Sequence, residues 1–142
     1  MVNFGFGIIL VLSQLLSLGG GLPQVMEANY SDAAVEAGAS GEIVVSFGVL
    51  DGYVINRMPP IQLKLQPVDG LTHDAANLVS PSEDAKSDDE YYVDVPTFFV
   101  EVEATAAGEY EIPGELVYFF CSKADGFCSR QIVDVVVPVT AE

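Results

Sequence analysis

Two cysteines are the residues of this sequence best suited to chemistry. Cys121 and Cys128 are the only cysteines in the 142-residue chain, and six residues lie between them. Cysteines at the ends of adjoining strands can meet with their Cα atoms about 5.5 Å apart, the usual disulfide separation. A disulfide closing so short a loop constrains the unfolded chain by only roughly 2.5 kcal/mol. The pair could therefore serve thiol–disulfide exchange or act as an inert staple of the last hairpin, and the spacing alone favours the staple.

Exchange makes further demands on the residues around the pair. The attacking cysteine must be accessible and must have a lowered pKa, because the thiolate is the nucleophile. Lys123 and Arg130 would favour a thiolate, whereas Asp125 would oppose it or relay a proton. The spacing does not tell which of the two cysteines attacks.

The remaining candidates for a site are weaker. His73 and Asp74 form a lone pair in a polar loop with no nucleophile motif, so we expect them to be solvated. The window 83–94 has six acids and one lysine, but its spacing fits no EF-hand loop. One histidine and two cysteines cannot supply a four-ligand Cys/His zinc site. The sequence therefore predicts neither a metal nor a cofactor.

The composition indicates one acidic, globular domain. The chain has 21 acidic and five basic side chains, for a formal charge of −16, and half of its residues are hydrophobic. Binding to nucleic acid or to an anionic membrane surface requires clustered Lys and Arg, which this chain lacks. A hydrophobic share this large supports a packed core rather than a disordered acidic chain.

The N-terminus resembles a segment for export. Residues 1–26 carry no charged side chain, and 4–18 are almost continuously apolar. Glycines at 19–21 and Pro23 follow this run, and they favour a cleaved secretory signal that spans residues 1–28. A retained membrane anchor is the alternative. Either would export the remainder, in which 29–41 reads as a linker. Disulfides persist outside the cytosol, so export predicts that the two cysteines are paired.

Beyond residue 41 the sequence predicts short strands separated by turns. The clearest alternation of apolar and charged residues runs over 98–104, and 68–90 shows little periodicity and is expected to be a loop. Pro113-Gly114 is expected to turn the chain. The other expected strands are 42–50, 53–57, 61–66, 108–112, 115–120 and 129–139. This pattern predicts an all-β, immunoglobulin-like antiparallel β-sandwich over 42–142, with an up-and-down barrel as the alternative.

Three stretches carry a resemblance to a known family. The first is 51–57 (DGYVINR) with Pro59 and Pro60 behind it, the second is 89–102, and the third is 116–128 (LVYFFCSKADGFC), the most specific. Together they resemble the N-terminal periplasmic domain of DsbD-type thiol:disulfide interchange proteins. The resemblance covers nearly the whole expected domain.

The resemblance implies a redox function. It implies an immunoglobulin-like sandwich in the periplasm or outside the cell that passes electrons through Cys121 and Cys128. Its partner would be a thioredoxin-fold protein or a membrane electron donor, expected here as a separate protein. On this basis exchange is favoured over the alternative, a binding or structural module with an inert disulfide.

The family also shields its cysteine pair with an aromatic side chain on a loop. The matching stretch, 82–86, has no aromatic residue. Tyr91, Tyr92 and Phe127 are the candidates for this shielding role.

Overall fold

The chain folds into an all-β sandwich, as predicted, rather than the alternative barrel. The structure is a computed structural model that describes residues 22–31, 34–80 and 90–142. These residues contain no helix and form two antiparallel sheets. The strands are β1 (Met26–Tyr30), β2 (Ser40–Val49), β3 (Tyr53–Ile55), β4 (Gln62–Leu65), β5 (Leu71–His73), β6 (Leu78–Val79), β7 (Phe98–Ala104), β8 (Gly108–Ser122) and β9 (Cys128–Ala141).

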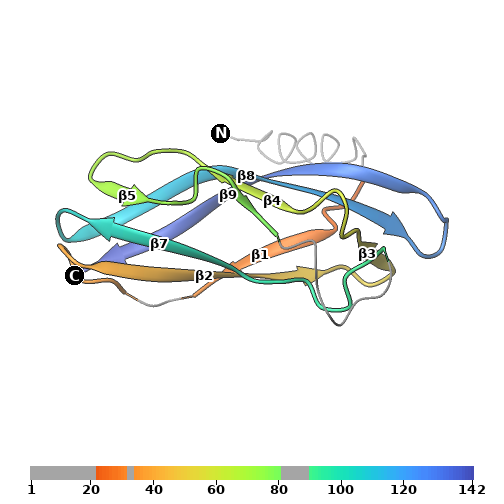
Figure 1. Cartoon of the computed structure of the whole chain (residues 1–142), viewed down its shortest axis with the longest axis horizontal. Coiled ribbons are helices and arrows are strands. Elements are labelled where there is room, and N and C mark those ends of the chain that lie inside the picture. The colour runs from red at the N-terminus through yellow and green to blue at the C-terminus, as the bar shows by residue number, and fades with distance from the viewer. Residues whose placement is uncertain (1–21, 32–33, 81–89) are drawn as a thin grey trace, which may run out of the picture.

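The second sheet is built around a long hairpin. The first sheet has the order β1-β2-β7-β5, and in the second β8 pairs with β9 on one edge and with β3 and β4 on the other. The β8–β9 hairpin runs along the long axis of the molecule, with its tip at one end, near β3, and the C-terminus at the other (Figure 1). The two cysteines therefore lie at the β3 end of the sandwich.

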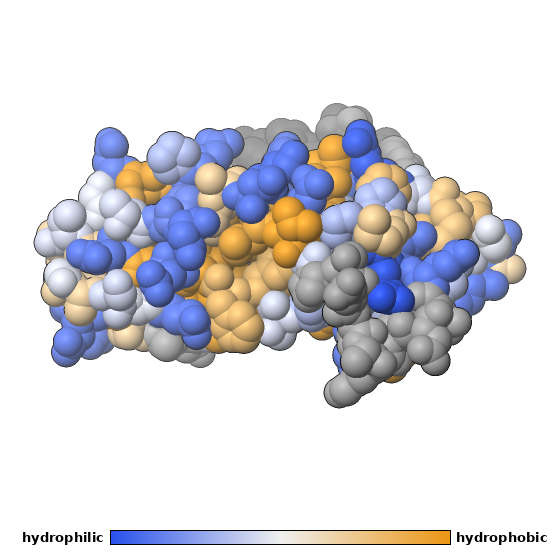
Figure 2. Space-filling view, in the orientation of Figure 1, coloured by the Kyte–Doolittle hydropathy of each residue, from blue (hydrophilic) through white to orange (hydrophobic). Residues whose placement is uncertain are grey.

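Alternation places one face of each long strand in the core. Along β7, Phe98, Val100, Val102 and Ala104 are buried while the residues between them are exposed, which confirms the predicted strand. β9 follows the same rule, with Val135, Val137 and Val139 buried. On the outside, Figure 2 shows apolar side chains gathered in the middle of the visible face, with hydrophilic ones on either side.

The turn predicted at Pro113-Gly114 is wrong, because both residues lie within the continuous strand β8. The Pro113 carbonyl accepts a hydrogen bond from the Gln66 amide (2.9 Å), so the backbone groups of Pro113 point away from β9. The missing amide hydrogen of the proline therefore costs the β8–β9 ladder no bond. Gly114 serves a close approach, since a Cβ there would lie 2.3 Å from the Lys64 carbonyl oxygen.

The segment 68–90, predicted as a loop, contains the short strands β5 and β6. His73 is structural rather than simply solvated. Its Nδ1 accepts a hydrogen bond from the Ala75 amide (3.1 Å), and its Nε2 therefore carries the proton donated to the Gln66 carbonyl (2.8 Å). Its neighbour Asp74 accepts a hydrogen bond from the Glu101 amide (3.2 Å). The bond from His73 to Gln66 fastens the crossover from β4 to β5, and the bond to Asp74 ties the end of β5 to β7.

The packed fold begins well before residue 42, the predicted start of the sandwich, and also before the predicted end of the leader at residue 28. Val25 and Met26 are 1% and 0% exposed, and β1 pairs with β2 from Met26 to Tyr30. Val35 is also buried and bridges to Ala141. Much of the predicted linker, 29–41, is thus part of the fold. The sequence hid this because the apolar start of β1 continues directly from the leader-like run.

Residues 1–21, on which the expectation of a signal or anchor depends, lie outside the described residues. Within the described part of the chain, no helix is long and apolar enough to cross a membrane.

A polar clamp ties the N-terminal segment to the hairpin. The Tyr118 hydroxyl accepts a hydrogen bond from the Met26 amide (2.9 Å) and donates one to Gln131 Oε1. Gln131 Oε1 also accepts from the Val25 amide (2.9 Å), and Gln131 Nε2 donates to the Pro23 carbonyl (2.9 Å). Burial raises the pKa of the Tyr118 phenol, so it stays protonated and remains a donor at neutral pH. We call Tyr118 and Gln131 the N-terminal clamp.

Candidate functional site

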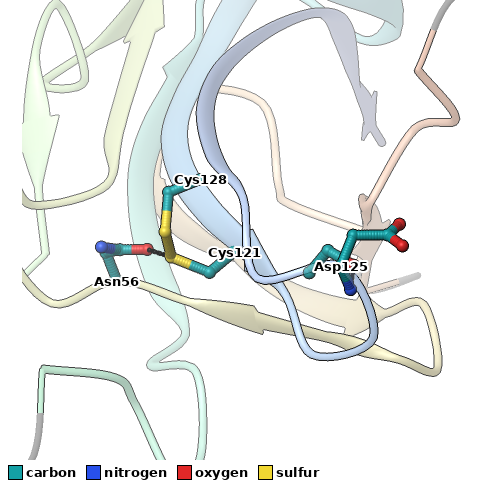
Figure 3. The surroundings of a disulfide bond; sticks show 5 residues. Asn56, Cys121, Asp125 and Cys128 are labelled. Atoms are coloured by element: carbon teal, nitrogen blue, oxygen red, sulfur yellow. Dashed lines mark hydrogen bonds between the residues drawn. A yellow bond between two sulfur atoms is a disulfide. The ribbon is translucent and has the colours of Figure 1, made fainter.

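Cys121 and Cys128 form a disulfide at the tip of the β8–β9 hairpin (Figure 3). The two residues stand directly opposite each other in neighbouring strands, with an S–S distance of 1.97 Å and a Cα–Cα distance of 3.9 Å. The Ser122 amide donates to the Phe127 carbonyl (2.8 Å), so the cysteines occupy the next, non-hydrogen-bonded pair of the ladder. Side chains approach most closely at such pairs. The predicted pairing is confirmed.

The hairpin turn is built by local chemistry. Gly126 has a φ of 74°, a left-handed conformation that glycine adopts without strain. The Ser122 carbonyl accepts from the Gly126 amide (2.9 Å), and the Ser122 hydroxyl accepts from the Asp125 amide (3.2 Å). Phe127 then packs edge-to-face against Phe120, with ring centroids 6.1 Å apart. The run Gly-Phe-Cys thus closes the turn and anchors it to the core.

The two sulfur-bearing residues differ sharply in exposure. Tyr118 and Phe120 point into the core, so the alternation of β8 places Cys121 on the opposite, outer face of its sheet. Cys121 is nevertheless only 4% exposed, whereas Cys128 is exposed. Val54 of β3 stands directly opposite Cys121 on its other side. Of the two residues, Cys128 is therefore the one within reach of a molecule from solvent.

Asn56 lies against the buried cysteine, a role that its place in the sequence does not predict. Its Oδ1 is 3.4 Å from Cys121 Sγ, the contact drawn in Figure 3. Asn56 belongs to the stretch 51–57 that carried the resemblance, and it follows β3 directly. Only the pairing of β3 with β8 brings the two residues together, because 65 positions separate them in the chain.

Of the three aromatic candidates for shielding the pair, Tyr91 is the one that lies on the cysteine face of the sheet. Tyr92 is buried and its hydroxyl bonds to Ser80 Oγ (2.9 Å), while Phe127 packs on the core side of the hairpin. Tyr91 pairs with Asn56 across an antiparallel bridge, which places it on the face where the Asn56 side chain meets Cys121. The stretch 82–86, matched to the family's shielding loop, lies outside the described residues.

The charged residues near the pair are arranged unequally. Arg130 is exposed and stands opposite Phe119, on the same face of the sheet as the cysteines. Lys123 is exposed in the turn, and its amide donates to the Gly52 carbonyl (2.8 Å). The Asp125 carboxylate points away from the disulfide (Figure 3), so its considered part as a proton relay gains no support.

The other candidate sites gain no function from the structure. Among the described residues, no three His, Cys, Asp or Glu side chains gather as a metal site would require. Most of the acidic window 83–94 lies in the undescribed segment 81–89.

Neither a protein-family model nor a curated protein sequence matches this chain. The case for a function therefore rests on the geometry of the disulfide and on the residues around it.

Proposed function

We propose that this domain passes electrons by disulfide exchange between its Cys121–Cys128 pair and a thioredoxin-fold partner outside the cytosol. The observation that supports this most is the unequal burial of the two residues, with Cys128 exposed and Cys121 covered. Exchange needs one reachable sulfur for the partner and one protected sulfur that leaves and returns. The resemblance to the DsbD-type N-terminal domain points to the same partner class.

The exchange balances over two steps. A partner thiolate attacks Cys128 Sγ, the S–S bond breaks, and its electron pair stays on Cys121 Sγ, which takes up a proton. The partner's second cysteine, as a thiolate, then attacks the partner sulfur of the mixed disulfide and releases Cys128 as a thiolate, which is protonated in turn. The pair gains two electrons and two protons, and the partner dithiol becomes a disulfide. Reversing the steps reduces an acceptor.

The position of the bond argues against a role as a staple. β8 and β9 pair continuously from Gly108–Ala141 to Cys121–Cys128, so the hairpin is held along its whole length without the disulfide. Closing the short turn adds only roughly 2.5 kcal/mol by the loop-entropy estimate.

The alternative is a binding or structural module with an inert disulfide, and the close cover over Cys121 favours it. Structural disulfides in exported proteins typically have potentials below about −300 mV. We expect equilibration of the domain with glutathione buffers to give a potential well above that range. The double variant with both cysteines replaced by serine is expected to keep its fold, with a modest loss of thermal stability. A potential under about −300 mV, together with a large loss of thermal stability, would establish the staple instead.

Export, on which this function depends, predicts where the mature chain begins. Removing Val25 or Met26 would empty part of the core and remove the partners of the N-terminal clamp. If a leader is cleaved, mass spectrometry of the protein from its native host should find the new N-terminus between residues 20 and 24. A start beyond Met26 would contradict this placement, and an intact Met1 in a soluble cytosolic fraction would contradict export.

A further inference from the structure

The carboxamide of Asn56 is in contact with the covered sulfur of the pair. Its Oδ1 lies 3.4 Å from Cys121 Sγ, and at this distance it can accept a hydrogen bond from the sulfur once that sulfur carries a proton. In the disulfide the sulfur has no hydrogen to donate. The contact can therefore become a hydrogen bond only in the reduced protein.

The backbone holds this side chain in place from two sides. The Asn56 amide donates to the Phe119 carbonyl of β8 (2.9 Å), and Asn56 is bridged on its other side to Tyr91. At the neighbouring residue, the last of β3, the Ile55 carbonyl accepts from the Tyr92 amide (2.9 Å). Asn56 thus stands between two paired segments, and its carboxamide reaches Cys121 without a flexible loop.

We propose that Asn56 is a positioning residue that accepts a hydrogen bond from the Cys121 thiol after the disulfide opens and so keeps this sulfur protonated. This deepens the proposed function and rests on it. A thiol is a far poorer nucleophile than a thiolate, so a protonated Cys121 attacks the mixed disulfide on Cys128 slowly. The partner's second cysteine then has time to complete the transfer. By keeping Cys121 protonated, Asn56 makes Cys121 the leaving sulfur, and Cys128 is then the sulfur that bonds to the partner.

The charged groups near the pair do not replace this contact. Arg130, on the cysteine face of β9, and Lys123, in the turn, are both exposed and therefore screened by solvent. The Asp125 carboxylate points away (Figure 3). Tyr91, on the bridged segment, lies on the same face as Asn56. Among the described residues, the Asn56 carboxamide is thus the group whose contact with Cys121 Sγ the geometry establishes.

The test measures the Cys121 thiol alone, in a Cys128→Ser background. The readout is the iodoacetamide alkylation rate at pH 7 divided by its plateau at high pH, which cancels differences in access. In Asn56→Ala this ratio should rise roughly fivefold, the size expected for loss of one hydrogen bond that favours the thiol. In Asn56→Asp it should fall, because a second negative charge beside the sulfur opposes the thiolate.

Val54→Ala is the matched control. Val54 stands directly opposite Cys121 on the neighbouring strand, so its truncation opens similar space without removing an acceptor. Its ratio should stay at the value of the Cys128→Ser parent. An equal rise in Val54→Ala and Asn56→Ala would show that Asn56 only covers the sulfur, and an unchanged or raised ratio in Asn56→Asp would also overturn the proposal.

A second readout uses the intact pair. Because the hydrogen bond exists only in the reduced state, Asn56→Ala should lower the equilibrium constant for reduction by glutathione by roughly fivefold. An unchanged constant would count against the proposal. If the proposed function itself is wrong, the result differs: the cysteine variants trap no partner. The alkylation ratios of Asn56→Ala, Val54→Ala and Asn56→Asp keep their expected ranking in that case, because they depend only on the Cys121 thiol.

Discussion

Replacing Cys128 with serine should abolish exchange with the thiol partner, whereas replacing Cys121 should leave a protein that captures this partner. In Cys121→Ser the exposed Cys128 remains and can form a mixed disulfide that no internal cysteine reopens. In Cys128→Ser the remaining Cys121 is 4% exposed and lies behind Val54 and Asn56. The probe is a thioredoxin-fold protein that lacks its second cysteine and carries glutathione in a mixed disulfide on its first, so that attack by the thiolate of the domain releases glutathione and leaves a stable complex. It should trap about an order of magnitude more complex with Cys121→Ser than with Cys128→Ser, measured on non-reducing gels and by mass spectrometry.

Each of these variants is the control for the other, because both remove the same disulfide. Circular dichroism and thermal unfolding should be nearly the same for the two proteins. Equal trapping by both would show that burial does not decide which cysteine meets the partner. Trapping by neither would remove the support for exchange.

Replacing Gly114 with alanine should be among the most destabilising single changes in the sandwich. A Cβ at this position would lie 2.3 Å from the Lys64 carbonyl oxygen and 2.5 Å from Leu65 Cδ2, so the paired strands β4 and β8 must move apart. We expect a loss of about 3 kcal/mol in the free energy of unfolding, the upper part of the range for overpacking. Urea unfolding followed by circular dichroism measures it.

Gly48→Ala provides the matched control. Gly48 also lies in a strand, but a Cβ there would meet no atom within 4 Å. Its effect should stay within about 0.5 kcal/mol, as for other surface substitutions. Similar losses of stability for the two variants would contradict the close approach of β4 to β8 at Gly114.

The elements that could be predicted are those whose pattern is local. β7 was predicted from its alternation alone, and most of β9 was predicted as the strand 129–139. The failures depend on partners far along the chain. Position 114 requires a glycine because Lys64 and Leu65 of β4 approach its backbone closely. A rule for turns considers only neighbouring residues and cannot detect this approach. β5 and β6 are too short, at three and two residues, to show any period.

The candidate site was predictable in part for the same reason. The pairing of Cys121 with Cys128 followed from their proximity and from the expected export. The cover over Cys121 did not, because alternation places this residue on the outer face, where a side chain is ordinarily exposed. Val54 and Asn56 supply the cover from a strand that pairs with β8 only in the folded molecule.

The N-terminal clamp ties the beginning of the chain to its end, and this has a consequence for biosynthesis. Gln131 lies in the last strand and accepts a hydrogen bond from the amide of Val25, which is 106 positions earlier in the chain. The ribosome makes β1 early and β9 last, and contacts between distant positions repay their closure entropy only when both ends are present. The sandwich therefore closes only once β9 has been made. Until then the apolar sides of β1 and β2 are uncovered, so each new copy is most prone to aggregate before β9 joins the sheet.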